Sequence, residues 1–129
     1  MGTGRGIAKG WNPIIEAAIR EHLKKPLLPY NKSTGNWPKN QYLTEADLEK
    51  VTELFFSGNQ LNDVKGLEKL DQLKELWLGH NQLTSVKGLE KLTQLKLLDL
   101  RDNPALTKAQ IDQLQKALSN CKIISNATL

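Results

Sequence analysis

The chain has 129 residues, of which 39% are hydrophobic and 25% are charged, and its formal net charge is +4. This composition is typical of one globular domain, and no apolar run is long enough to form a membrane-spanning helix. The basic residues are spread along the chain and form no concentrated stripe, so nucleic-acid binding is the weakest of the functions considered.

The first ten residues (MGTGRGIAKG) are rich in glycine and contain no apolar segment like that of a signal peptide. We therefore expect a flexible start at 1–10 and a cytoplasmic protein that does not bind membranes. Cys121 is the only cysteine, which excludes an intrachain disulfide and fits a reducing compartment.

A helix that caps the rest of the chain is predicted within 11–26. Asn12 is a good N-cap and Pro13 suits the first helical position. Apolar residues then recur at helical spacing until Pro26, so the helix itself should run from about 13 to 25. Such a helix would close the open end of a stacked array of strands.

Residues 27–43 form an inserted segment whose Pro, Gly, Asn and Ser content predicts a loop. The segment holds three of the chain's aromatic residues, Tyr30, Trp37 and Tyr42. One interpretation is that they pin the loop onto the cap helix. The other is an interaction loop, because long ordered loops are often functional.

Residues 44–103 repeat themselves at a step of 22, since Leu54, Leu76 and Leu98 recur at this spacing. Thr44 begins a capping box and opens a half unit that leads into the first full repeat. A fixed step of roughly 20–29 residues with the pattern LxLxxNxL is the signature of leucine-rich repeats. The match is dense, so it predicts the fold strongly and the function only in outline.

The repeats resemble the 22-residue units of bacterial leucine-rich-repeat proteins, in the class that includes internalins and a protein-phosphatase regulatory subunit. The first helix and the segment LTEADLEKVTEL resemble the helical cap of that class, although the long loop between them departs from it. The resemblance implies an α/β fold. It would be a short right-handed solenoid with parallel strands on the concave face, 3₁₀ or irregular segments on the convex face, and a cap at each end.

The pattern also assigns roles within each unit. Alternation with period two predicts short strands whose leucines point inward, and three-residue steps around Gly66 and Gly88 predict 3₁₀ turns on the outer side. Asparagines after the strands should satisfy backbone groups of the neighbouring turns. This structural ladder comprises Asn59, Asn81, Asn103 and Asn126.

Residues 104–129 are predicted to form a C-terminal cap made of one helix and one strand. Thr107 begins a second capping box, so a helix is expected over 108–119. The strand that follows should close the array.

The register of that strand is predicted from its asparagine. Aligning Asn126 with Asn103, a step of 23 residues, places Cys121 at the position of Leu98. Cys121 is then a small inward-facing residue and not a nucleophile.

The side chains between the inward leucines form the predicted binding face. In its central column Phe55 and Trp77 lie side by side, followed by Asp99 and Lys122. Exposed aromatic side chains add little to stability, whereas exposed apolar patches with Trp and Arg mark contact sites. Alternatively, the loop at 27–42 covers Phe55. The predicted binding residues are Phe55, Trp77, His80, Asp99 and Arg101.

The sequence contains no recognisable catalytic motif, and its two histidines, His22 and His80, lie on different predicted elements. His80, Asp99 and Asp102 fit a solvated mixed-charge face better than a metal site. We predict no catalytic residue, no metal and no cofactor.

The predicted function is non-catalytic recognition of another protein through the concave face, by a monomer or weak homodimer. The alternatives are a structural or homo-oligomeric scaffold with the aromatic face buried, and an adaptor that binds through the loop at 27–42.

Overall fold

The computed structural model describes residues 12–23, 43–58 and 60–127. Some predictions fall outside these ranges, namely those for 1–10, Tyr30, Trp37, Tyr42 and Asn59.

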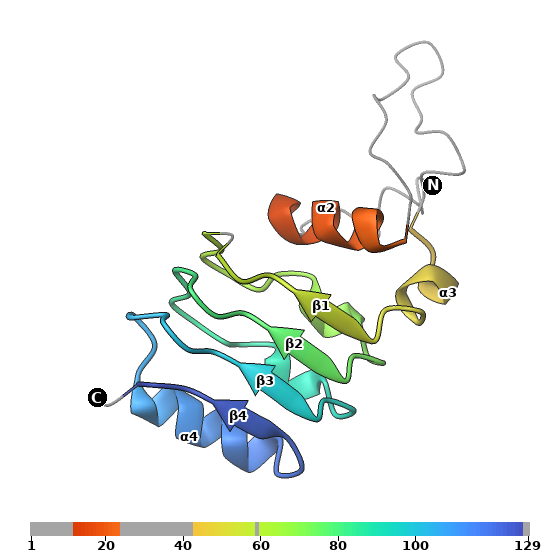
Figure 1. The fold of residues 1–129 in the computed structure, drawn as a ribbon. Helices are drawn as coiled ribbons and strands as arrows, with labels where there is room; N and C mark the ends of the chain where they lie inside the picture. Colours follow the sequence, from red (N-terminus) through yellow and green to blue (C-terminus); the bar gives the residue numbers. More distant parts are fainter. Residues whose placement is uncertain (1–11, 24–42, 59, 128–129) are drawn as a thin grey trace.

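Four short parallel strands form one sheet in the order β1-β2-β3-β4, so strands that are consecutive in the chain are neighbours in the sheet (Figure 1). Across the first three strands the pairing follows the repeat, with Leu54 beside Leu76 and Leu76 beside Leu98. The predicted parallel sheet is confirmed. Its strands are Glu53–Phe55 (β1), Glu75–Trp77 (β2), Leu97–Asp99 (β3) and Lys122–Ile124 (β4).

Short 3₁₀ helices form the outer side of the repeats, as predicted. They are η2 (Leu67–Lys69) and η3 (Leu89–Lys91), and each follows a glycine. Gly66 and Gly88 have φ angles of 102° and 103°, in the left-handed region that strains residues with a Cβ atom. This conformation explains why glycine recurs at the same step of the repeat.

The core lies between the sheet and the 3₁₀ segments and is one continuous cluster from Ile15 to Cys121. Equivalent repeat positions supply most of it: Leu54, Leu76 and Leu98 are only 3%, 0% and 0% exposed. Full burial of one such side chain stabilises the fold by about 1.5–3 kcal/mol. Stacked repeats therefore build a core that a single unit lacks.

Asn81 and Asn103 follow their strands at the predicted position, and both are buried. The Asn81 Oδ1 accepts a hydrogen bond from the Leu61 N–H at 2.9 Å, and its Nδ2 donates to the Phe56 and Leu78 carbonyls at 3.0 and 2.9 Å. Asn103 makes the same set of bonds one unit later. Both amides thus satisfy buried backbone groups, as the repeat pattern predicts.

Helix α2 (Pro13–His22) lies over the β1 end of the sheet (Figure 1). Asn12 is its N-cap, as predicted, because its Oδ1 accepts from the Ile14 N–H at 2.9 Å. The Nδ2 of the same side chain donates to Asp63 in the first repeat at 3.1 Å. One residue therefore both starts the helix and ties it to the repeats.

The inner side of α2 joins the core through Ile15 and Ile19, which are fully buried. The helix ends at His22, three residues before the predicted end at 25.

The capping box predicted at Thr44 is confirmed and begins α3 (Glu45–Leu48). The Thr44 Oγ1 accepts from the Asp47 N–H at 3.1 Å, and the Asp47 carboxylate accepts from the Thr44 N–H at 3.0 Å. Leu43 is fully buried and Leu48 is 5% exposed. Both occupy the positions of a hydrophobic staple, so the last residue of the predicted loop belongs to the core.

The second predicted capping box begins α4 (Lys108–Ala117). The Thr107 Oγ1 accepts from the Gln110 N–H at 3.2 Å, and the Gln110 Oε1 accepts from the Thr107 N–H at 2.8 Å. The helix ends two residues before the predicted end at 119. It packs beside η3, where a further repeat would place a 3₁₀ segment.

The predicted register of β4 is wrong by two residues, because Leu98 pairs with Ile123 and not with Cys121. The cause is the turn that ends α4. The Gln115 side chain donates to the Cys121 carbonyl at 2.8 Å and holds this residue in the turn, so the strand begins only at Lys122. Cys121 is nevertheless buried, as predicted.

The shifted register changes two assignments. Ile124, and not Lys122, lies beside Asp99 in the central row of the sheet. Asn126 is exposed, unlike the buried asparagines of the two preceding units. Its Oδ1 accepts from the Asp102 N–H at 3.0 Å, and its Nδ2 donates to the Asp102 carboxylate at 2.9 Å.

Candidate protein-interaction surface

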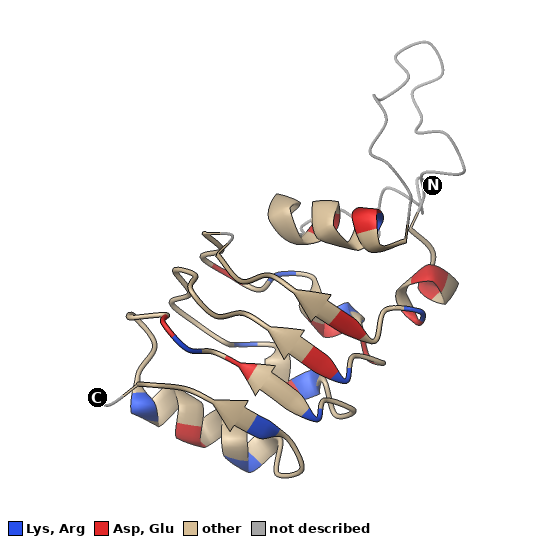
Figure 2. Cartoon of the chain, in the orientation of Figure 1, with Lys and Arg blue, Asp and Glu red and all other residues tan. Residues whose placement is uncertain are grey.

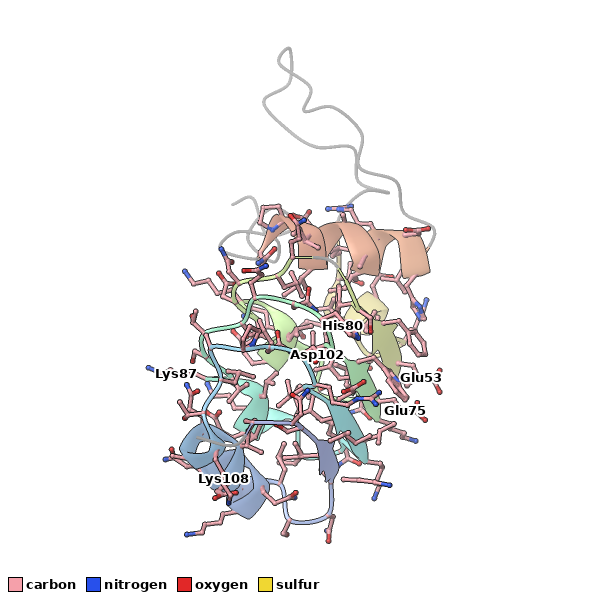
Figure 3. All side chains as sticks on the ribbon, turned by 60° about the vertical axis from the view of Figure 1, so that its left-hand side comes forward. Glu53, Glu75, His80, Lys87, Asp102 and Lys108 are labelled. Carbon is pink, nitrogen blue, oxygen red and sulfur yellow. The ribbon has the colours of Figure 1, made fainter. Side chains whose placement is uncertain are left out.

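The exposed sheet face is the side of the sheet that points away from the core. Figure 3 shows Glu53 and Glu75 next to each other on this side, with Lys87 on the other side of the molecule. Two rows cross the strands, Glu53, Glu75, Leu97, Lys122 and Phe55, Trp77, Asp99, Ile124. The turn residues that complete the face are His80, Arg101 and Asp102.

An aromatic stack occupies β1 and β2 on this face. The rings of Phe55 and Trp77 are 6.0 Å apart at their centroids and 18° from parallel. Phe55 is 62% exposed, and the only other large apolar side chain exposed in the described ranges is Ile14, at 37%. The Trp77 Nε1–H donates to the Glu75 Oε1 at 3.2 Å, which orients the indole. The structure therefore brings the two predicted aromatic residues together, with Phe55 exposed and Trp77 half-buried.

A bidentate ion pair occupies β3. The Arg101 Nε and Nη2 donate to the two carboxylate oxygens of Asp99, each at 3.0 Å, and the Arg101 backbone N–H donates to the same carboxylate at 3.0 Å. The Asp99 side chain is only 5% exposed, whereas that of Arg101 is 51% exposed. Asp99 therefore positions a guanidinium whose outer part faces solvent.

The protonation of Asp99 follows from this pairing. Burial alone would raise the pKa of the Asp99 carboxyl, but the hydrogen bonds and charge of Arg101 outweigh it and hold the pKa below its ordinary value. The same contact raises the pKa of Arg101.

His80 and Asp102 form a second contact beyond the strands, with the His80 Nε2 3.2 Å from the Asp102 Oδ2 (Figure 3). Both residues have left-handed φ angles, 57° and 59°, and Gly58 has φ of 72° at the equivalent position of the first unit. His and Asp are among the non-glycine residues found more often in this region. The turn geometry accounts for these residue types without requiring a catalytic role.

A pair of carboxylates borders the aromatic stack and was left out of the predicted site. Glu53 lies directly beside Glu75, one position along the row from Phe55 and Trp77. The sequence contains the signal: the two glutamates are 22 residues apart and each stands two residues before an aromatic one. On a strand, residues two apart share a face.

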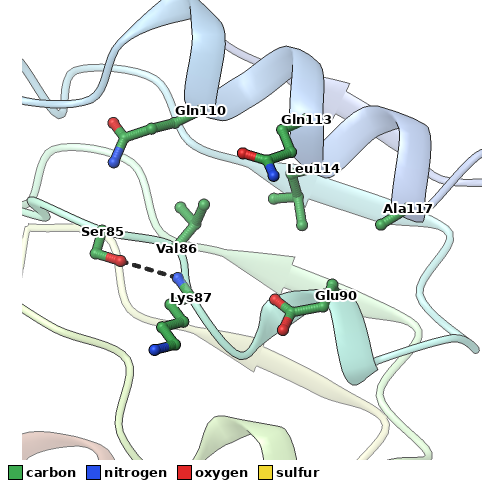
Figure 4. Close-up of a pocket in the computed structure, with 8 residues that line it drawn as sticks. All are labelled: Ser85, Val86, Lys87, Glu90, Gln110, Gln113, Leu114 and Ala117. Carbon is green, nitrogen blue, oxygen red and sulfur yellow. Dashed lines mark hydrogen bonds between the residues drawn. The ribbon is translucent and has the colours of Figure 1, made fainter.

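The outer side of the repeats contains shallow grooves. One has a volume of about 360 Å³ and lies between η3 and α4, with Val86 and Leu114 among its lining residues (Figure 4). A second, of about 400 Å³, lies one unit earlier and includes Val64, which is equivalent to Val86. Because the groove recurs at the repeat step, it follows from the packing of successive units and does not indicate a specific site.

The described ranges contain no group of three or more His, Cys, Asp and Glu residues placed to hold a metal ion. Within the same ranges, no helix is both long enough and apolar enough to cross a bilayer.

The repeats match a known family. Residues 49–91 and 71–116 both fit the family model described as leucine-rich repeats (2 copies), and together these segments cover more than half of the chain. This chain belongs to the leucine-rich-repeat family. No curated protein matches it significantly.

Similar solved structures come from bacteria. A leucine-rich-repeat protein of Leptospira interrogans is 31% identical, with 67% of this chain and 21% of that one covered and a TM-score of 0.54. Internalin C2 and the internalin inlF of Listeria monocytogenes are 19% and 17% identical, with TM-scores of 0.52 and 0.51. Each covers 95% of this chain, which spans 60% and 46% of their lengths. At these identities the two internalins show the fold alone.

Membership in the leucine-rich-repeat family separates two kinds of residue. The buried leucines, the glycines before the 3₁₀ helices and the two buried asparagines form the scaffold that the repeats share. The exposed sheet face differs from unit to unit, since the positions of Phe55, Trp77 and Asp99 are equivalent.

Proposed function

We propose that this chain is a non-catalytic module that binds another protein through the exposed sheet face. The stack of Phe55 on Trp77 is the observation that supports this proposal. It places the exposed Phe55 ring on the half-buried Trp77 ring at the β1 edge of the sheet, and exposed apolar area of this kind typically marks a contact site. Leucine-rich-repeat proteins generally bind other proteins, which agrees with this role.

The remaining predicted residues suit the rim of such a contact. Arg101 is held in one orientation by the bidentate pair with Asp99, so little side-chain entropy is lost when it meets a partner. His80 is 70% exposed and lies beyond the strand ends. We assign direct contact to Phe55, Trp77, His80 and Arg101, and a positioning role to Asp99.

Since the buried Cys121 also fits a reducing environment, we place this interaction in the cytoplasm.

The test compares capture of partners from a native lysate by the wild-type chain and by the Phe55→Ala/Trp77→Ala variant. Loss of a specifically captured protein is expected, because aromatic anchors at the centre of an interface contribute most of the binding energy. Ile14→Ala is the matched control, since Ile14 is the other exposed large apolar side chain within the described ranges. Capture that survives removal of both rings rejects the proposal.

Light scattering on the purified chain examines the second possibility, that the stack is covered by another copy of the same chain. If the wild type is a dimer and the Phe55→Ala/Trp77→Ala variant is a monomer, the aromatic stack contacts a second copy of this chain and not a different protein. A monomer at all accessible concentrations favours a different protein as the partner.

A further inference from the structure

We infer that the exposed sheet face binds a basic side chain, Lys or Arg, of a protein segment, which lies over the aromatic stack and against the carboxylates of Glu53 and Glu75. This inference rests on the proposed function and names the chemistry of the partner.

The first argument is the placement of these four side chains. Glu53 is in register with Glu75, and Phe55 with Trp77, on adjacent strands. Adjacent strands are about 4.8 Å apart, and residues two apart on one strand share a face. The two carboxylates and two rings therefore form one compact group, and the Trp77 Nε1–H···Oε1 bond to Glu75 joins its halves.

The second argument is that the carboxylates are uncompensated. Glu53 and Glu75 form no ion pair with any side chain in 12–23, 43–58 or 60–127. The only basic residue in their row, Lys122, is separated from Glu75 by the whole of β3. In Figure 2 the starts of β1 and β2 are acidic and the start of β4 is basic, and basic segments also lie directly before β2 and β3, where the sequence has Lys74 and Lys96.

Like charges at directly neighbouring strand positions repel each other, so this arrangement lowers stability instead of raising it. A cation bound between the two carboxylates would relieve the repulsion. Unfavourable side-chain arrangements of this kind are expected mainly at functional sites, where stability is lowered in return for binding.

The third argument concerns the rings. The faces of Trp and Phe attract cations through their quadrupole, and the attraction strengthens as water is excluded. A basic side chain over the stack would gain this attraction and the carboxylate contacts together. A neutral apolar partner would have to desolvate two carboxylates that have no ion pair within the described ranges, and an acidic partner would be repelled by them.

The open shape of the face indicates a protein segment instead of a small cation. Small ligands bind in concave sites that enclose most of their surface. The two grooves described above lie on the outer side of the repeats, away from Phe55 and Trp77. A segment that crosses the strands would contact the stack, the carboxylates and Arg101 along one path.

Random peptides displayed on phage are the probe, selected on the purified chain at low salt. Each selected peptide is then synthesised, and its Kd is measured for the wild type and for the Glu53→Gln/Glu75→Gln and Phe55→Ala/Trp77→Ala variants. Glu21→Gln/Glu49→Gln is the matched control, because it removes two exposed carboxylates, on α2 and at the end of α3, that form no ion pair with another described residue. Circular dichroism checks that every variant is folded.

Selected peptides are expected to share a Lys or Arg whose replacement by Gln weakens binding about tenfold. Glu53→Gln/Glu75→Gln should weaken binding by a similar factor. Combining this variant with the Gln-substituted peptide should cause little further loss, and such a double-mutant cycle shows that the basic residue of the peptide contacts the two glutamates. Added salt should weaken wild-type binding more than binding by the Gln variant. The control should bind as the wild type does.

The outcomes separate this inference from the proposed function. Peptides that require Phe55 and Trp77 but lack a basic residue, or that bind the Gln variant equally well, overturn the inference and leave the proposed function standing. Peptides that bind every variant alike, or a selection that yields none dependent on the exposed sheet face, overturn both.

Discussion

The two halves of the exposed sheet face have the same backbone and opposite chemistry. On β1 and β2, the aromatic stack is open and two neighbouring carboxylates have no cationic partner in the described ranges. On β3, Asp99 is buried and paired with Arg101, and His80 and Asp102 pair with each other beyond the strands. The side chains of the second half pair with one another, although Arg101 and His80 stay exposed, whereas Glu53 and Glu75 of the first half form no ion pair within the described ranges.

This difference arises from the side chains and not from the backbone. The step of 22 residues places Phe55, Trp77 and Asp99 at equivalent positions, so the backbone does not distinguish them. Only the side chains differ, and each is free to differ because the core leucines and the asparagines maintain the fold. Substitutions in the shared scaffold, in the paired half and in the unpaired half should therefore have effects of decreasing size on stability.

The largest effect is expected for the scaffold that supports both halves. Asn103→Ala leaves the Leu83 N–H and the Leu78 and Leu100 carbonyls without this side-chain partner. The free energy of unfolding should fall by about 3 kcal/mol, because buried unpaired backbone groups are costly. Urea denaturation measures the change. Asn126→Ala is the control, since Asn126 is exposed, and an equal loss there would contradict a buried structural role for Asn103.

An intermediate effect is expected for the paired half. Asp99→Asn removes the charge of a nearly buried carboxylate and its bidentate pair with Arg101. The free energy of unfolding at neutral pH should fall by about 2 kcal/mol, in the range for hydrogen bonds to charged groups.

The pH dependence of the Asp99→Asn variant gives a further check. Because the pKa of Asp99 is below its ordinary value in the folded chain, its contribution to stability is fully present above the unfolded pKa. It is lost as the pH falls from about 4 through the folded pKa. The difference between wild type and Asp99→Asn should therefore be constant near neutral pH and shrink in acid. A difference that grows in acid would contradict the assigned direction.

The smallest effect, of opposite sign, is expected for the unpaired half. Glu53→Gln/Glu75→Gln removes two neighbouring like charges and should raise the free energy of unfolding by a few tenths of a kcal/mol. The gain should disappear at high salt, where repulsion between exposed charges is screened. Urea denaturation at low and high salt measures it. A clear loss of stability would show that these carboxylates serve the fold and would remove one argument for a basic partner.

Much of the fold could be predicted because its determinants are local or periodic. Asn12, Thr44 and Thr107 each start a helix through side-chain bonds to residues two or three positions away. Such short-range bonds leave a direct pattern in the sequence.

The register of β4 could not be predicted by counting residues. The connections between the first three strands have equal length, so residues 22 apart in the sequence are neighbours in the sheet. Before β4, α4 replaces the outer connection, and the bond from Gln115 to the Cys121 carbonyl delays the strand. The placement of Ile123 beside Leu98 therefore depends on how a helix ends, which the repeat step does not encode.

By itself, the sequence determined the repeat, the inward leucines, the buried asparagines and the capped helices, because each depends on spacing along one stretch of chain. The repeat step also predicted which strand positions are neighbours, whereas the orientation, pairing and burial of the side chains at these positions came from the tertiary structure. The tertiary structure stacked Phe55 on Trp77, paired Asp99 with Arg101, and placed Glu53 beside Glu75 with no cationic partner among the described residues. Those contacts depend on rotamers and on burial by neighbouring units, and they divide the exposed sheet face into a paired half and an available half.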